Sequence, residues 1–296
     1  MATLRMVREQ HMVRAGNVLR RVGAAALATG LQPADNVRVA LTHHVAPGEY
    51  DNFARLIDQL CSERDLLDAG EVVRSYADRG SGALGGKRLA FTFDDGLLSS
   101  FHAAQSVLNP RAIKAIFFIP TMILDLTSPD QMRDFFRQNV YRRPSGELAA
   151  HKYMTMSADH LRELHQQGHT VLPHTHSHVS LLSLTSTADM DRELRMPKLL
   201  LEDMLQSPSE GVAFPFGTDK VVHGAAYEAI RRLYRVCFTG LGGINSAKTD
   251  AHCLHRDCVH PYHQPAHVGN VSAGSFDLYY TYKMRRLKRR IAVHAG

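Results

Sequence analysis

The sequence predicts a single-domain α/β fold built on a parallel β-sheet. Six short apolar runs have the length of buried strands: 37–41 (VRVAL), 88–93 (RLAFTF), 115–119 (AIFFI), 170–172 (TVL), 211–214 (GVAF) and 235–239 (RVCFT). Helical patterns lie between these runs, and strands that alternate with helices pair in parallel. Neither an internal repeat nor a linker-like stretch divides the 296 residues, so we expect one domain.

The predicted helices follow from apolar spacing and capping residues. In 53–60, apolar side chains recur at positions i, i+3, i+4 and i+7, which places them on one helical face. A second helix includes the leucines of 161–164. Ser186 and Asp189 have the spacing of a capping box, so we expect a helix from there through Leu205.

The net charge of +6 is concentrated at the two ends of the chain. Residues 282–290 carry six basic side chains and no acidic one, and residues 1–21 carry five arginines against one glutamate. The middle is therefore weakly acidic, which argues against a nucleic-acid-binding surface there. We expect a basic N-terminal helical extension (1–35), a barrel domain (36–275) and a basic C-terminal tail (276–296).

The composition predicts a cytoplasmic protein. No apolar run approaches the roughly 18 residues of a membrane-spanning helix, and 22–27 (VGAAAL) is too short for a secretory signal. Four cysteines in a chain of this size fit a reducing compartment without a disulfide framework. The basic ends are expected to be solvated, with peripheral contact to anionic lipid at the inner membrane face as the alternative.

Reactive side chains follow four of the predicted strands. They are His43 with His44, Asp94 with Asp95, the histidines of 174–178, and Pro215 with Phe216. In parallel barrels the carboxyl ends of the strands meet at one face, so we expect these residues to form one site. The long connection 123–152 is either a lid over this site or an insertion.

The DDG triplet (94–96) and the HTHSH stretch predict a metal site. On an extended strand His174, His176 and His178 would share one face, whereas on a helical turn only His174 and His178 would do so. Two histidines and one carboxylate are a common ligand set for catalytic zinc. A water on such a metal becomes a nucleophile near neutral pH, and the second carboxylate would then serve as general base.

Three segments together resemble the polysaccharide deacetylases, carbohydrate esterase family 4, which share the NodB homology domain. KRLAFTFDDG (87–96), HTHSH (174–178) and AFPFG (213–217) are similar to the first three motifs of this family. The resemblance covers most of the chain, from 37 to 256. It is closest to the exopolysaccharide-type members.

The resemblance implies a distorted (β/α) barrel and a hydrolase that removes the N-acetyl group from an N-acetylhexosamine unit of a glycan or glycan precursor. It also implies one divalent metal, zinc in the first place, with cobalt or nickel as alternatives. Asp95, His174 and His178 match the metal ligands, and Asp94 matches the general base. His176 stands at the variable position between them, where we expect packing or solvent exposure.

The third motif departs from the family in one place. Pro215 and Phe216 match its Pro-aromatic pair, and because proline has no N–H, the Phe216 N–H would donate toward a developing oxyanion. The family has an arginine where this chain has Ala213. Arg256 resembles an element of the exopolysaccharide-type members and is the candidate replacement, with a surface position as the alternative.

The general acid is predicted near the N-terminus. The usual C-terminal histidine motif has no match, but exopolysaccharide-type members look circularly permuted, and VALTHHVAP (39–47) is similar to their N-terminal element. One alignment makes His43 the acid, and a shift of one residue makes it His44. Either imidazolium would protonate the leaving amine.

A second group of metal-binding residue types lies in HCLHRDCVHPYH (252–263), with two cysteines and four histidines. It predicts either a structural zinc or a polar loop near the site. The spacing of the cysteines is not that of a usual zinc knuckle, which favours the loop.

Other activities fit part of the pattern. These are hydrolysis of another non-peptide C–N bond, as in allantoinase- or imidase-like relatives, an iron(II) oxygenase with a facial triad, and a sugar-binding pseudoenzyme. The presence of Asp94 and of the ligand set favours the N-deacetylase. A cytoplasmic location and the absence of tryptophan favour a nucleotide-linked, lipid-linked or small amino-sugar substrate over a finished polymer.

Overall fold

The computed structural model describes residues 33–78, 85–142 and 146–292. Its main sheet is parallel, with strands in the order β5-β4-β3-β1-β8, and β2 also pairs with β3. The strands are β1 (Asn36–Thr42), β2 (Asp65–Leu66), β3 (Lys87–Phe93), β4 (Ile116–Ile119), β5 (Thr170–Pro173) and β8 (Asp257–Cys258). A second parallel pair consists of β6 (Gly211–Ala213) and β7 (Val236–Phe238).

The two sheets form a distorted barrel. Leu254 joins β7 to the main sheet, because its N–H donates to the Cys237 carbonyl at 3.0 Å and its own carbonyl accepts from Thr239 N at 2.8 Å. The chain then continues into β8, which pairs with β1. In the described residues β5 and β6 belong to different sheets, and this break distorts the barrel. The predicted parallel α/β architecture is confirmed.

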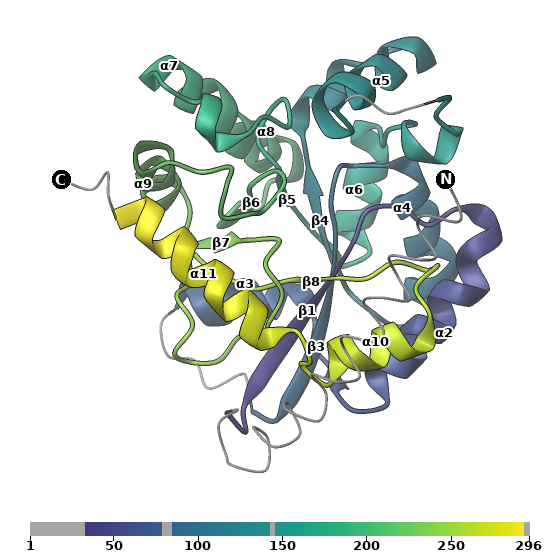
Figure 1. Ribbon diagram of the computed structural model, residues 1–296. Coiled ribbons are helices and arrows are strands. Elements are labelled where there is room, and N and C mark those ends of the chain that lie inside the picture. Colours follow the sequence, from purple (N-terminus) through teal and green to yellow (C-terminus); the bar gives the residue numbers. More distant parts are fainter. Residues whose placement is uncertain (1–32, 79–84, 143–145, 293–296) are drawn as a thin grey trace.

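Helices surround the strands, as Figure 1 shows. They are α2 (Tyr50–Cys61), α3 (Ala69–Ala77), α4 (Leu98–Ala103), α5 (Pro129–Phe135), α6 (Ala158–Gln166), α7 (Thr187–Met190), α8 (Met196–Leu205), α9 (Gly224–Leu233), α10 (Pro265–Ser272) and α11 (Asp277–Ala292). The predicted capping box is confirmed, because the Ser186 side chain accepts from Asp189 N at 3.1 Å. A π-helical turn, Asp191–Arg195, connects α7 to α8 and makes the segment continuous.

Both faces of the central strands are buried, which explains their continuous apolar runs. In β4, Ile116 and Phe118 pack into one apolar cluster and Phe117 and Ile119 into another. The alternation follows from the two-residue period of a strand.

The long connection 123–152 contains short helices. Besides α5 it holds a π-helical turn, Phe136–Val140, and a 3-10 turn, Ala150–Lys152. Phe135 and Phe136 are buried in the core, so this part of the connection packs as a structural element. The turn then leads to Tyr141, which borders the pocket described below.

The structure tests the predictions for the two basic ends of the chain to different extents. The expected extension at 1–35 lies outside the described residues, except for its last three. The C-terminal region forms α11, which buries Met284 and Leu287 and places Arg286 3.1 Å from the buried carboxylate of Asp219. Within the described residues, no helix combines the length and the apolar character that crossing a bilayer requires.

A buried ion pair ties α11 to the barrel. The guanidinium of Arg38, on β1, donates to Asp257 of β8 and to Asp277 of α11, each at 2.7 Å. Arg38 is almost fully buried. A buried cation between two carboxylates holds three chain segments in one place, since removal of any member leaves an uncompensated charge.

Arg38→Ala is therefore expected to lower the free energy of unfolding by about 3–5 kcal/mol, because Asp257 and Asp277 lose their shared cation. Arg74→Ala is the matched control. Arg74 is 59% exposed and lies 3.9 Å from Asp68, so its loss should cost about 1 kcal/mol or less. Urea denaturation of both variants measures the difference, and equal midpoints would contradict the role assigned to Arg38.

Candidate active site

A pocket of about 390 Å3 opens at the carboxyl ends of the strands. It brings together side chains from segments far apart in the sequence. Its polar and aromatic lining consists of His43, His44, Asp94, Asp95, Tyr141, His174, His178, Phe216, Arg256, Cys258, His260 and Tyr262. Pro215 is buried directly beside it.

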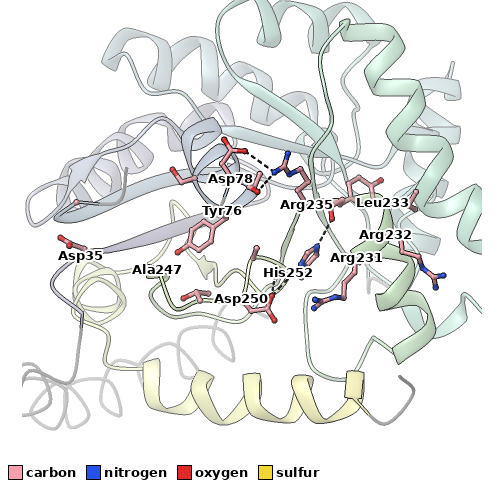
Figure 2. A pocket seen from close by; sticks show the side chains of 16 residues that line it. Asp35, Tyr76, Asp78, Arg231, Arg232, Leu233, Arg235, Ala247, Asp250 and His252 are labelled. Carbon is pink, nitrogen blue, oxygen red and sulfur yellow. Dashed lines mark hydrogen bonds and ion pairs between the residues drawn. The ribbon is translucent and has the colours of Figure 1, made fainter. Parts of the chain in front are cut away.

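A larger hollow of about 960 Å3 lies at the opposite end of the barrel. It is bordered by Asp35 and Gly85, just before β1 and β3, and Figure 2 shows its charged side chains. Arg235 there donates to the Ala77 carbonyl at 2.7 Å and lies 3.4 Å from Asp78. Among the described residues, neither group of convergent metal-binding side chains lies in this hollow, so the smaller pocket is the candidate active site.

Asp94 and Asp95 face the same pocket because the backbone turns sharply after β3. In a regular strand two neighbouring side chains point to opposite faces. Here Asp95 and Gly96 both have left-handed backbone angles, with φ of 75° and 66°. A Cβ on Gly96 would lie 2.4 Å from Ile123 Cδ1, and its φ strains any other residue, so glycine is favoured here. Asp95 is therefore held in a backbone conformation that residues other than glycine seldom adopt.

The histidine stretch is neither a strand nor a helix. β5 ends at Pro173, and the following loop contains Thr175 and His178 with φ of 62° and 57°. Glu193 holds this loop, because its carboxylate accepts from Ser177 N and from Ser177 Oγ, each at 2.9 Å. Glu193 was not predicted as part of the site, because its position inside a helical segment carries no sequence signal of a contact with the loop.

The loop separates the three histidines. His174 Nε2 lies 3.7 Å and His178 Nε2 lies 3.1 Å from Asp95 Oδ1. His176 is directed elsewhere, with its Nδ1 2.9 Å from Thr121 Oγ1. The arrangement predicted for a helical turn, in which His174 and His178 converge, is therefore present without the helix.

The convergent atoms fit a cation. His174 Nδ1 donates to the Ala213 carbonyl at 2.6 Å, and His178 Nδ1 donates to the Asn139 carbonyl at 3.2 Å. A carbonyl can only accept, so each Nε2 presents a lone pair. These two lone pairs and Asp95 Oδ1, which has no hydrogen-bond partner, lie within 4.8 Å of one another. Three buried acceptors aimed at one point match the ligand set of a divalent metal.

Arg256 makes a bidentate ion pair with Asp94. Its two terminal nitrogens donate to the two carboxylate oxygens at 2.6 and 2.8 Å, and its Nε donates to the Thr239 carbonyl at 2.8 Å. Arg256 is 1% exposed, so the surface position considered as an alternative is wrong. Burial raises the pKa of Asp94, but Arg256 and His174 outweigh this effect and hold the pKa below its usual value.

The two neighbouring histidines have opposite electrostatic environments. Burial lowers the pKa of His43, but a hydrogen bond with Cys258 and the charges of Asp95 and Asp94 outweigh it and raise the pKa to about 9. Burial and the nearby Lys152 lower the pKa of His44 to about 4. At neutral pH His43 is therefore protonated and His44 is neutral.

Phe216 lies against the candidate ligands. Its ring meets the His178 ring edge-on, with 4.9 Å between centroids. The Arg142 guanidinium lies over the Phe216 ring, 3.9 Å from the ring centroid. Phe216 has a φ of 63°, which makes it another strained position at this site. The following Gly217 leaves no room for a side chain, because a Cβ there would lie 2.2 Å from Gly240 N.

The cysteines and histidines of 252–263 do not form one cluster. His252 Nε2 lies 2.9 Å from the Tyr234 carbonyl, and Cys253 Sγ lies 3.0 Å from the Tyr227 hydroxyl, both away from the pocket. Only Cys258 and His260 of this stretch belong to a convergent group, together with His43. A structural zinc held within this one loop is therefore not supported.

The sequence of this chain matches a known protein family. The family model described as polysaccharide deacetylase matches residues 81–231, which is half of the chain and includes both aspartates and both candidate histidine ligands. This confirms the resemblance found in the sequence motifs. His43 and Arg256 lie outside the matched region. A search of curated proteins found no match.

Several solved structures share the fold. The Streptococcus pyogenes deacetylase PplD in complex with acetate has a TM-score of 0.61 and 19% identity, over 81% of this chain and 99% of its own. IcaB from Ammonifex degensii has a TM-score of 0.57 and 20% identity, over 81% and 97%. A de-N-acetylase from Aggregatibacter actinomycetemcomitans has a TM-score of 0.60 and 14% identity, over 80% and 100%. The distorted (β/α) barrel is thereby confirmed.

Removal of one candidate ligand tests the metal site. Asp95→Ala is expected to weaken binding of the first zinc equivalent by roughly 100-fold or more, because the only anionic ligand is lost. His176→Ala is the matched control, since His176 lies in the same loop but is directed toward Thr121. Competition with a chelator of known affinity measures both. Wild-type affinity in Asp95→Ala would show that the first cation binds elsewhere.

Proposed function

The chain belongs to the polysaccharide deacetylase family, and from this premise we propose that it hydrolyses the N-acetyl group of an N-acetylhexosamine unit in a glycan or glycan precursor. We propose that it does so with one divalent cation, zinc in the first place, held by Asp95, His174 and His178. The observation that carries this proposal is the convergence of three buried acceptor atoms within 4.8 Å. A cation bound there would supply Lewis acidity for the acetyl carbonyl and for a water molecule.

In the proposed reaction Asp94 is the general base. Its depressed pKa keeps it ionised at neutral pH, so it can accept the proton of the attacking water. The bidentate pair with Arg256 holds the carboxylate in a fixed orientation, as the missing arginine before Pro215 does in the family. Phe216 lines the pocket, and its backbone N–H is proposed to donate to the oxyanion that forms from the carbonyl.

His43 is proposed as the general acid. It lines the pocket and, with a pKa of about 9, carries the proton that the leaving amine requires. His44 also lines the pocket, but a pKa of about 4 leaves it without that proton at neutral pH. These two values support the alignment that assigns the acid to His43.

The exposed side chains of α11 support a location at a membrane surface. Leu278, Tyr279 and Tyr282 expose 73%, 54% and 59% of their surface, and six basic residues follow in 282–290. Apolar and aromatic side chains beside basic ones suit an anionic lipid surface, where each basic residue contributes about 1 kcal/mol. The cysteines at 61, 237, 253 and 258 are all free thiols. Together these features support a cytoplasmic enzyme at the inner membrane face with a lipid-linked precursor as substrate.

Acetate release from a panel of N-acetylated sugars tests this function. The panel contains UDP-linked, oligomeric and lipid-linked forms, the last in anionic and in neutral vesicles. Stripped protein should be inactive, one zinc equivalent should restore release, and the lipid-linked form in anionic vesicles should react fastest. Asp94→Asn should bind zinc normally but lose roughly 10²–10⁴-fold in kcat/KM, because the base is removed.

Other outcomes of the same assay point to other functions. Equal rates in anionic and neutral vesicles would remove the membrane proposal but leave the deacetylase. An absence of release from every sugar, with one zinc bound, would favour another C–N substrate. Sugar binding without turnover would favour the pseudoenzyme.

The pH profile tests the assignment of the acid. Because His43 must be protonated, kcat/KM should fall as the pH rises through the pKa of His43, which a cation on Asp95 lowers from its metal-free value of about 9. Cys258→Ser weakens the hydrogen bond that raises this pKa, so the alkaline limb should move to lower pH. His43→Gln should remove the limb together with most of the activity, whereas an unchanged alkaline limb in His43→Gln would contradict the assignment.

A further inference from the structure

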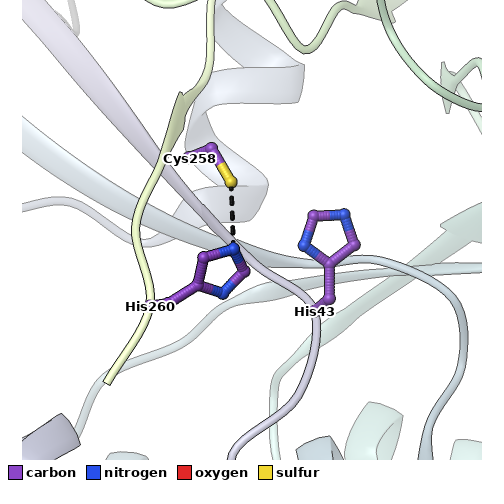
Figure 3. Close-up of side chains that lie close together, drawn as sticks. All are labelled: His43, Cys258 and His260. Carbon is purple, nitrogen blue, oxygen red and sulfur yellow. Dashed lines mark hydrogen bonds between the residues drawn. The ribbon is translucent and has the colours of Figure 1, made fainter. Parts of the chain in front are cut away.

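A second group of metal-binding side chains lies in the same pocket. His43, Cys258 and His260 each present one donor atom, and these atoms lie within 4.8 Å of one another. Figure 3 shows that His43 extends from the segment after β1, whereas Cys258 and His260 belong to β8 and the residues that follow it. None of the three belongs to the proposed ligand set of Asp95, His174 and His178.

The strand register creates this cluster. β1 and β8 are parallel, Leu41 pairs with Cys258, and Val259 N donates to the Leu41 carbonyl at 2.8 Å. Residues two apart on a strand point to the same face. His43 and His260 each follow this pair by two residues, and their rings are stacked with 5.5 Å between centroids. The backbone of the barrel therefore holds the donors together.

The donor set and its spacing suit zinc. Cys258 Sγ lies 3.3 Å from His260 Nε2, and a sulfur and a nitrogen on one tetrahedral zinc are roughly 3.6 Å apart by usual bond lengths. A thiolate with two imidazoles selects a soft or borderline cation over magnesium or calcium. Cys258 is exposed and the two histidines are half-buried, so a cation can reach the site from solvent.

We propose that His43, Cys258 and His260 form a second, inhibitory zinc site. When zinc binds, the Cys258 thiol proton and the His43 imidazolium proton pass to solvent, and the freed lone pairs are donated to the cation. His43 then has no proton for the leaving amine. Binding itself is independent of the proposed deacetylase reaction, and only the inhibitory effect rests on the role of His43 as general acid.

The site should be weaker than the one formed by Asp95, His174 and His178. That first set is buried, and its two Nε2 atoms and Asp95 Oδ1 already present lone pairs. No proton therefore has to leave when a cation binds there. The second set must release protons and lies partly in solvent. Zinc should therefore activate at low concentration and inhibit in excess.

The binding test uses the full chain and counts metal by equilibrium dialysis followed by elemental analysis. Wild type should bind two zinc ions. Cys258→Ser should bind one at the site of Asp95, and Asp95→Ala should bind one at the site of Cys258. With cobalt, a thiolate-to-metal charge-transfer band should accompany the second equivalent in wild type, persist in Asp95→Ala and be absent from Cys258→Ser. Cys61→Ser, which removes a half-buried thiol on α2, is the matched control and should behave as wild type.

The activity test compares each variant with its own maximal rate. Excess zinc should lower acetate release by wild type roughly 100-fold or more, as expected when an acid catalyst is lost, whereas magnesium should not. Excess zinc should lower acetate release by Cys258→Ser only about twofold or less, because this variant lacks the thiolate ligand of the second site. One zinc in wild type, or two in Cys258→Ser, would overturn the site, and two bound zinc ions without inhibition would overturn its effect. Failure of the deacetylase proposal alone would abolish acetate release but leave the cobalt–thiolate band.

Discussion

Two adjacent carboxylates buried at the end of β3 are the constraint on which the site depends. Asp94 and Asp95 are 3% and 2% exposed, and neighbouring buried anions destabilise a fold unless each is compensated. The barrel compensates them differently. Asp94 receives a bidentate guanidinium from Arg256, whereas Asp95 faces two imidazole lone pairs that offer it no proton. This asymmetry suits the roles proposed for the two carboxylates, a general base held in place at Asp94 and a cation ligand at Asp95.

The compensation of Asp94 depends on the far end of the chain. Arg256 immediately precedes β8, whose position is set by pairing with β1 and by the ion pair between Arg38 and Asp257. Arg38 also binds Asp277 at the start of α11. The C-terminal helix is thus linked to Asp94 through the buried ion pairs of Arg38 and Arg256, although it does not border the pocket. The same β1–β8 pairing brings His43 beside Cys258, so one strand register organises the proposed base, the proposed acid and the thiol.

The sequence predicted most of what depends on local pattern. Buried strands could be located because their apolar runs end in chemically reactive residues, and the aspartates and histidines could be identified from those ends. Contacts that depend on closure of the barrel could not be assigned from local pattern, and Arg256 was a candidate only through the family resemblance. The Arg256–Asp94 pair joins residues 162 positions apart, and only the β7–β8 connection brings them together. The irregular loop of 174–178 was equally inaccessible, since Glu193 and the Asn139 carbonyl, which shape it, carry no recognisable motif.

X-ray absorption spectroscopy of the protein with one zinc equivalent tests most directly the claim that Asp95 and two histidines form the primary cation site. If Asp95, His174 and His178 bind the first zinc, the spectrum will show two imidazole nitrogens and oxygen ligands, with no sulfur. A zinc–sulfur distance of about 2.3 Å at this loading would contradict it, because the first cation would then occupy the thiol of Cys258 in place of the buried carboxylate of Asp95.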